Sequence, residues 1–269
     1  MYFNFQSKAK YLYLFIFNFM KIVILGSGNV AFHLAKAFSE NKIGVSQIFG
    51  RNENALKEIS EKCHIPYSTD EMMEADLYLI AVKDDVTAEI SKKIIAQNCL
   101  VAHTSGSLPK EILEGNYRKA SFYPLQTFSK FKELNYAEIP FFVEAENQED
   151  QEILKNLALQ VSGNVMLSDY EKRKYIHLTA VFACNFVNHL FARAKEISDA
   201  QHIPFSYFLP LIDETVQKIH EIDPKSAQTG PAVRNDERVL QLHEDLITNE
   251  AHLKIYKTMN DSIKKMYEL

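Results

Sequence analysis

The chain has 269 residues, of which 46% are hydrophobic and 24% are charged. This composition is typical of a globular protein with a buried core, and it excludes disordered, collagen-like and low-complexity chains. The formal net charge of −5 argues against a dominant basic surface, so we expect no nucleic-acid partner.

The first nineteen residues differ in composition from the rest of the chain. They contain eight aromatic residues and two lysines but no acidic residue, and without them the net charge is −7. Their apolar run is about half of the roughly 20 residues that a membrane helix needs. No small-residue cleavage site follows it. We interpret residues 1–19 as an extension upstream of Met20, with a targeting signal as the alternative, and expect no membrane partner.

Cysteine and histidine spacing argues against disulfides and metal. Cys63, Cys99 and Cys184 are odd in number and widely separated, and no CxxC pair occurs. This usage is typical of a reducing compartment, so we expect a cytoplasmic protein. The nine histidines form neither an HExxH motif nor an i,i+4 pair, so we expect no metal site.

From Met20 to about residue 168, short apolar runs alternate with amphipathic stretches. The apolar runs predict strands at 21–25, 45–49, 77–82, 99–103, 120–123, 141–144 and 165–167. The amphipathic stretches predict helices at 30–41, 54–63, 86–96 and 150–161. This alternation predicts an α/β fold with a doubly wound parallel Rossmann sheet.

The last hundred residues show helical patterns and no strand signal. One long pattern covers residues 170–198, and others cover 207–221, 237–248 and 250–267. We therefore expect a Rossmann domain at 20–168, followed without a glycine-serine linker by an all-α domain at 169–269 that serves substrate binding or dimerisation.

A glycine-rich turn directly follows the first predicted strand and opens the first helix. Gly26-Ser27-Gly28-Asn29-Val30-Ala31 reads GxGxxA, in the context that a dinucleotide-binding motif requires. Gly26 permits the tight turn, Gly28 lets the backbone approach a pyrophosphate, and Ala31 allows close helix–strand packing. The helix N-terminus offers free N–H groups to phosphate. We expect Gly26 to Val30 to bind a dinucleotide; the alternative is a small-residue turn without a ligand.

The end of the second predicted strand indicates which dinucleotide. NAD-binding proteins commonly place Asp or Glu there, whereas this chain has Gly50-Arg51-Asn52. An arginine can hold a 2′-phosphate bidentately. We therefore predict NADP(H), contacted by Arg51 and Asn52; the alternative is a solvated arginine in a surface turn.

The next two predicted strands end in polar turns, Ala81-Val82-Lys83-Asp84 and His103-Thr104-Ser105-Gly106-Ser107. Ligands of open α/β sheets bind beyond the carboxyl ends of the strands. We expect Ala81, Val82, Lys83 and Thr104 to contact the cofactor. The hydroxyls of Thr104, Ser105 and Ser107 can hydrogen-bond the substrate or the carboxamide. The alternative for these residues is helix capping before Pro109, which we favour for Ser107.

The long helix carries a polar stripe. At 100° per residue, His177, Asn185 and Asn188 share one arc, while apolar residues occupy the opposite arc. Uncharged hydrogen-bonding groups suit a cleft better than full charges do. His177 is the best candidate for a general acid because imidazoles exchange protons near neutral pH. The alternative is an interhelical or dimer contact.

The segment Thr229-Gly230-Pro231-Ala232-Val233-Arg234-Asn235-Asp236 lies between predicted helices. Gly230 and Pro231 predict a turn. Arg234 either binds a substrate carboxylate or pairs with Asp236, and the alternative is a purely structural turn between domains.

These motifs together resemble a family. The GxGxxA turn, the Gly50–Asn52 and Ala81–Asp84 turns, His103–Ser107, Tyr123-Pro124-Leu125-Gln126-Thr127-Phe128, the His177–Asn185 helix and Thr229–Asp236 occur in this order. In this order, the motifs resemble those of Rossmann-like proteins whose C-terminal half is called domain of unknown function 2520. Such proteins are similar to pyrroline-5-carboxylate reductases, deazaflavin-dependent NADP oxidoreductases and β-hydroxyacid dehydrogenases. The resemblance implies NADP-linked hydride transfer between a Rossmann and a helical domain, in a homodimer.

Two positions depart from this pattern. The β-hydroxyacid dehydrogenases place a lysine four residues before an asparagine, whereas Val181 precedes Asn185 here. Many relatives also carry His-Pro where this chain has Tyr123-Pro124, and tyrosine is a poor proton shuttle at neutral pH.

The sequence thus predicts an NADP(H)-dependent oxidoreductase acting on a small carbonyl, imine or hydroxy-acid substrate. The alternatives are a non-catalytic NADP-binding sensor or scaffold, and a prephenate-dehydrogenase-like enzyme. We expect the reacting centre to contain His177, Asn185 and Ser105. The expected substrate contacts are His103, Tyr123, Gln126, Asn188 and Arg234.

Overall fold

The computed structural model describes residues 20–269, so the predicted extension at 1–19 lies outside the described part. The chain divides into two compact units, the first ending at Cys184 and the second running from Asn185 to Leu269. The sequence places the domain boundary at residue 168; by contacts, the helix that follows stays with the first unit. Within residues 20–269, no helix is long and apolar enough to cross a membrane.

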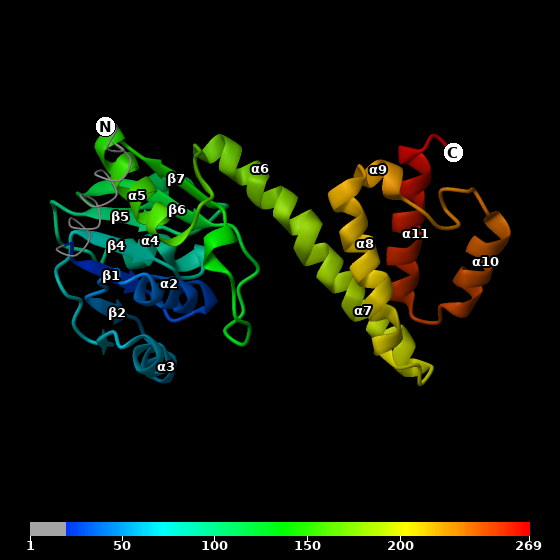
Figure 1. The fold of residues 1–269 in the computed structure, drawn as a ribbon, viewed down its shortest axis with the longest axis horizontal. Helices are drawn as coiled ribbons and strands as arrows, with labels where there is room; N and C mark the ends of the chain where they lie inside the picture. Colours follow the sequence, from blue (N-terminus) through cyan, green and yellow to red (C-terminus); the bar gives the residue numbers. More distant parts are fainter. Residues whose placement is uncertain (1–19) are drawn as a thin grey trace, which may run out of the picture. The chain divides into compact units, whose positions relative to one another are not determined.

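The first unit is built on an eight-stranded sheet, coloured blue to green in Figure 1. Its strand order is β3-β2-β1-β4-β5-β6-β7-β8. The strands are β1 (Ile22–Leu25), β2 (Gln47–Phe49), β3 (Tyr67–Ser68), β4 (Leu77–Ile80), β5 (Leu100–His103), β6 (Arg118–Pro124), β7 (Phe141–Ala145) and β8 (Val165–Leu167). The predicted Rossmann fold is confirmed, and β3 is an addition that its two-residue length hid from sequence patterns.

Two strands, β7 and β8, run against the predicted direction. The β6–β7 pair is antiparallel, whereas the other six pairs of the sheet are parallel. No crossover helix joins β6 to β7, only the loop at 125–140. A parallel pairing needs a crossover over the sheet, so this loop returns the chain as an antiparallel neighbour.

Helices cover both faces of the sheet. On one face, α2 (Asn29–Glu40), α3 (Glu53–Cys63) and α5 (Gln148–Val161) pack on the alternate strand residues that form the larger core. The other face holds a smaller core with α4 (Thr87–Ser91) nearby. The predicted helix at 86–96 ends early because the Ser91 hydroxyl donates to Ala88 O and accepts from Glu114 N, which competes with helical bonding.

The long helical segment changes its helix type at the boundary between the two units in the sequence. It consists of α6 (Tyr170–Ala180), a π-helical stretch (Val181–Phe186) and α7 (Val187–Ala200). The helix is predicted correctly, but the 100° step used for the polar stripe is wrong across the π-helical stretch. A π-helix bonds i to i+5, so Asn185 and Asn188 leave the arc that α-helical geometry assigns to them.

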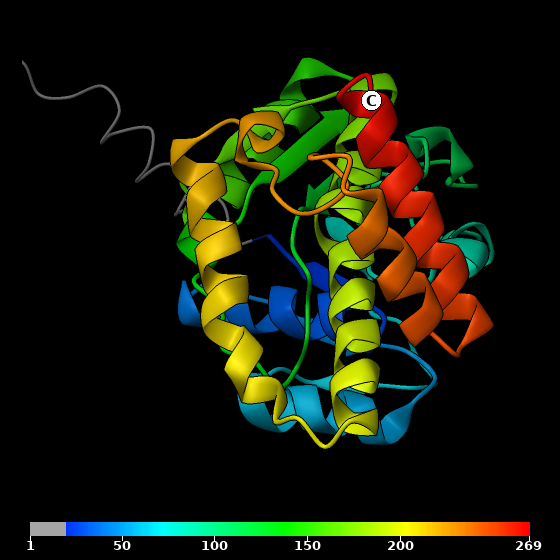
Figure 2. The ribbon, with the colours of Figure 1, turned by 90° about the vertical axis from the view of Figure 1, so that its right-hand side faces the viewer.

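The second unit contains α7, α8 (Leu209–Glu221), α9 (Pro224–Ala227), α10 (Glu237–Leu246) and α11 (Glu250–Met266). Helices α10 and α11, orange and red, lie side by side in Figure 2. A hydrogen bond between His243 Nδ1 and Tyr256 Oη (2.9 Å) and an ion pair between Lys257 and Glu244 (3.0 Å) join them. The all-α character of this half is confirmed.

Candidate cofactor and substrate site

The turn after β1 brings the carboxyl ends of three strands together. Gly26 has φ +129°, and a Cβ added to it would lie 2.2 Å from the carbonyl oxygen of Ala81, at the end of β4. Its N–H donates to Phe49 O at the end of β2 (2.8 Å). Only glycine combines this dihedral angle with such a close approach.

The start of α2 suits a negatively charged ligand. A Cβ added at Gly28 would have no heavy atom within 4 Å, so the backbone is open on that side. The first turn of α2 contains no acidic residue, and Ala31 is fully buried against the sheet. The free N–H groups and the positive end of the helix dipole therefore fit a pyrophosphate.

A cavity of about 580 Å³ lies at this edge of the sheet. It is lined by ten of the eleven predicted cofactor contacts: Gly26, Ser27, Gly28, Asn29, Val30, Arg51, Asn52, Ala81, Val82 and Lys83. Thr104 is not among the lining residues, because its hydroxyl turns back to Ile80 O (3.3 Å). Asn52 also has a structural task, since its side chain accepts from Ala55 N and caps α3.

Two cationic residues, Arg51 and Lys83, line the cavity. Arg51 is exposed and makes no hydrogen bond or ion pair with any residue of the described chain. Asp85 lines the same cavity, so the charge there is not uniformly positive. An uncommitted guanidinium at the end of β2 fits a 2′-phosphate, as the sequence predicts.

Ser105 links the loops that follow β4 and β5. Its hydroxyl donates to Asp84 Oδ2 (2.9 Å) and accepts from the N–H of Ser107 (3.0 Å). Asp84 directly precedes Asp85, which lines the cavity. The hydrogen bond of Ser105 therefore links the loop after β5 to the rim of the cavity. The expected cap at Ser107 is wrong: the next helical turn begins at Lys110, and its N-cap is Pro109.

Tyr123 and His177 form a hydrogen-bonded pair. Tyr123 Oη lies 2.9 Å from His177 Nδ1, between the end of β6 and α6. Burial raises the pKa of Tyr123 to about 12, so its hydroxyl stays protonated at neutral pH. The direction of this hydrogen bond follows the tautomer of the ring: the hydroxyl donates to Nδ1 when Nε2 carries the proton.

Gly106 makes room for this pair, and sequence reasoning missed it. A Cβ added there would lie 2.7 Å from Tyr123 Cζ and 2.8 Å from His177 Cβ. Its position in the polar His103–Ser107 turn was the one signal available, but nothing local shows that two distant side chains close over it.

His103 is fully buried instead of lining the cavity. Its Nδ1 accepts from Ser105 N (3.2 Å). Burial, with the nearby charge of Arg173 as the second cause, lowers the pKa of His103 to about 3. The ring is therefore neutral, and it supports the β5 loop from within.

This burial predicts an acid sensitivity. Between about pH 6.5 and 3 the unfolded chain binds a proton at His103 that the folded chain does not, so the free energy of unfolding falls by about 1.4 kcal/mol per pH unit. Above pH 6.5 His103 is neutral in both states and lowers no stability, whereas the free energy of unfolding decreases as the pH falls below that value. Urea unfolding of wild type and His103→Gln between pH 7 and 5 measures it. The variant should show the shallower slope, and equal slopes would contradict the assignment.

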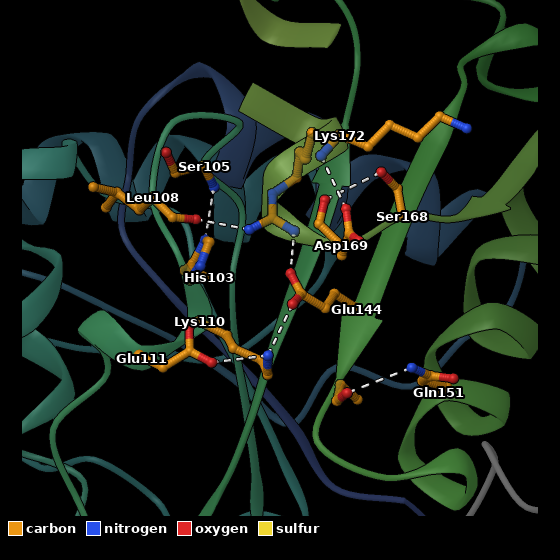
Figure 3. A network of polar contacts seen from close by, with 12 residues as sticks. His103, Ser105, Leu108, Lys110, Glu111, Glu144, Gln151, Ser168, Asp169 and Lys172 are labelled. Carbon is orange, nitrogen blue, oxygen red and sulfur yellow. Dashed lines mark hydrogen bonds and ion pairs between the residues drawn. The ribbon is translucent and has the colours of Figure 1, made fainter. Parts of the chain in front are cut away.

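A buried polar network, drawn in Figure 3, lies beside His103 and was also missed. Arg173 of α6 is fully buried and binds Glu144 Oε2 of β7 (2.5 Å) and Leu108 O (2.7 Å). Lys110 contacts Glu144 Oε1 (2.8 Å) and Glu111 (2.9 Å). In the sequence, these charges look like ordinary solvated residues.

The remaining predicted site residues are exposed. Gln126 is exposed, and its side-chain oxygen accepts from Thr127 N (2.8 Å). Asn185, Asn188 and Arg234 belong to the second unit and are exposed. Asp236 caps α10 through Val239 N, and among the described residues no ion pair joins it to Arg234, so the alternative of an Arg234–Asp236 pair is not found. Gly230 has φ +109°, as the predicted turn requires.

Comparisons with known proteins agree with the fold. A family model described as NADP oxidoreductase, coenzyme F420-dependent, matches residues 21–105. A second, described as a domain of unknown function, DUF2520, matches residues 139–263. A search of the curated proteins gives no match.

Solved structures add three similar chains. A candidate NADP oxidoreductase from Bacteroides fragilis is 40% identical, over 93% of this chain and 98% of that chain, with a TM-score of 0.88. Protein TM1727 from Thermotoga maritima is 22% identical over 92% and 100%, with a TM-score of 0.76. A pyrroline-5-carboxylate reductase from Coxiella burnetii is 14% identical over 92% and 93%, with a TM-score of 0.55. The last two show the fold alone.

The fold and the cavity define a dinucleotide-binding protein of the Rossmann class. Within that class, the chain belongs to the family of NADP oxidoreductases that join such a domain to a DUF2520 domain. NADP(H), the cofactor predicted from Arg51, is the one that these comparisons support.

Proposed function

We propose that the protein is an NADP(H)-dependent oxidoreductase acting on a small carbonyl, imine or hydroxy-acid substrate. The observation that carries the proposal is the uncommitted Arg51 on a cavity closed by the Gly26 turn. The backbone from Gly26 to Val30 would hold the pyrophosphate, and Arg51 the 2′-phosphate. When bound, the cofactor supplies or accepts a hydride.

His177 would move the proton that accompanies this hydride. In the tautomer that accepts from Tyr123 at Nδ1, His177 would present Nε2–H as the group that protonates a carbonyl oxygen or an imine nitrogen. Ser105 would hold the neighbouring loop against the cavity rim through Asp84. The roles of Asn185 at the reacting centre and of Asn188 and Arg234 as substrate contacts stay predictions from the sequence.

A second candidate is an NADP-binding sensor or scaffold without turnover. Val181, where β-hydroxyacid dehydrogenases carry a lysine, favours it. NADPH oxidation against a panel of keto acids and cyclic imines separates the two functions. Including prephenate with NADP⁺ tests the third alternative, a prephenate-dehydrogenase-like enzyme. Tight binding with no turnover, unchanged in His177→Ala, would favour the sensor.

Replacing Arg51 with alanine should weaken NADPH binding by about 10- to 150-fold. Charge-assisted hydrogen bonds contribute about 1.5–3 kcal/mol, and each 1.4 kcal/mol is tenfold in affinity. NADH lacks the 2′-phosphate, so its affinity should not change. Calorimetry with both nucleotides measures the difference. Lys57→Ala is the matched control, because Lys57 is exposed on α3 but does not line the cavity. An equal loss for both nucleotides would contradict the role of Arg51.

We also propose a cytoplasmic homodimer. Between Asn185 and Leu269, the only buried hydrophobic residues are Ala232 and Leu240, whereas Leu211 and Leu246 are 64% and 70% exposed. Helices with this much exposed apolar surface need a partner surface, and a second copy supplies a matching one. Sedimentation equilibrium should give twice the 31.0 kDa of one chain. A monomer at micromolar concentration would refute this.

A further inference from the structure

Two side chains of helix α6 reach the sheet face opposite the larger core. The strand residues Ala102, Ala120 and Val143 belong to that core, so their neighbours along β5, β6 and β7 point to the other face. Two rows cross this other face in register. One row joins His103, Ser121 and Glu144, and the next joins Tyr123 with Phe142.

The spacing of these rows matches one turn of α6. Ser121 and Tyr123 are two residues apart on a strand, which is about 6.6 Å. Arg173 and His177 are four residues apart on α6, which is about 6 Å. Arg173 contacts the first row through Glu144, and His177 contacts the second row through Tyr123.

Arg173 is held at two separate points. One terminal nitrogen donates to Glu144 of β7, and the other donates to the carbonyl oxygen of Leu108 in the loop after β5. Lys110 holds the second oxygen of Glu144, which fixes the carboxylate in turn. A planar guanidinium bound at both ends allows little rotation or sliding of the helix that carries it.

Stability alone gives little reason for such a pair. Replacing a buried ion pair by well-packed apolar residues is often neutral or stabilising. Here Arg173 Nε also has no hydrogen-bond partner among residues 20–269, so the desolvation of the cation is incompletely compensated. What the pair does supply is a fixed register between α6 and the strands.

We propose that Arg173, through Glu144 and the carbonyl of Leu108, is the positioning residue that sets His177 against Tyr123. The assignment of a proton-transfer role to His177 rests on the proposed function. The positioning itself is a statement about the His177–Tyr123 hydrogen bond, so it can be measured without a substrate.

The test uses the full chain with ¹⁵N-labelled histidine. The signature is the difference in the His177 Nδ1 chemical shift between wild type and Tyr123→Phe, with His177→Gln for assignment. In the double variant Arg173→Met/Glu144→Leu, we expect loss of this signature, with the shift moving to the Tyr123→Phe value. The melting temperature should stay close to that of wild type. The matched control is Arg118→Met/Asp150→Leu, which removes an ion pair between β6 and α5 (2.7 Å) and should leave the signature intact.

A wild-type Nδ1 shift in the double variant would overturn the proposal. If that variant does not fold, Arg173→Lys decides, because one ammonium nitrogen does not replace two contacts made by separate guanidinium nitrogens. In Arg173→Lys, the Nδ1 shift of His177 should move toward the Tyr123→Phe value, and an unchanged shift would again overturn the proposal. NADPH calorimetry on the same samples separates the two questions. Wild type that binds no NADPH refutes the proposed function but leaves the positioning result standing.

Discussion

Replacing Gly26 with alanine is expected either to weaken NADPH binding at least about 30-fold or to destabilise the fold by about 2–6 kcal/mol. The new Cβ would lie 2.2 Å from Ala81 O, at a φ of +129° that side chains rarely adopt. Backbone strain of about 1–3 kcal/mol and a steric cost of similar size add to about 2–6 kcal/mol. The turn either keeps its place and the protein loses that stability, or it moves and the pyrophosphate site is lost.

Calorimetry with NADPH and thermal unfolding together measure this effect. Gly44→Ala is the matched control, because a Cβ there would have nothing within 4 Å and the cavity does not include it. The control should bind and unfold like wild type. A Gly26→Ala protein with wild-type affinity and melting temperature would show that the turn is not needed for the cofactor.

Gly106→Ala and His177→Ala should each lower kcat by about 100- to 10,000-fold, the usual contribution of a positioned general acid. The first places a Cβ 2.9 Å from His177 Cγ and so displaces the ring, whereas the second removes it. NADPH affinity should stay near wild type, since neither residue lines the cavity.

Steady-state rates, measured with whichever keto acid or cyclic imine wild type turns over, test this pair of variants. Gly163→Ala serves as the control, because the nearest atom to its new Cβ would be Ala137 O at 3.8 Å, an ordinary contact. A Gly106→Ala enzyme with normal kcat would refute the claim that this glycine makes room for the His177–Tyr123 pair.

Features formed by residues that are close together in the chain were predictable from the sequence. The Gly26 turn, its strand and its helix lie within about twenty residues, and Arg51 follows at the end of the next strand. Local periodicity and turn chemistry therefore sufficed to place ten of the cavity residues.

Features made by distant segments were not predictable. Arg173 meets Glu144 across 29 positions, and Tyr123 meets His177 across 54. Each residue alone looks like a surface charge or an ordinary aromatic. The π-helical stretch was not predictable either, since no single residue within Val181–Phe186 indicates it. The 100° step of an α-helix therefore gave wrong positions for the residues beyond it.

The strand order has a consequence for how the first unit assembles. Within the described sheet, the pairing of β1 with β4 closes the longest stretch of chain, joining Ile22 to Leu77, whereas the β6–β7 hairpin joins Pro124 to Phe141. Loop-closure entropy must be overcome before a distant pairing stabilises the chain. The contact of Gly26 with Ala81 depends on that longest closure. The nucleotide cavity therefore depends on the strand pairing that has the largest loop-closure cost in the described sheet.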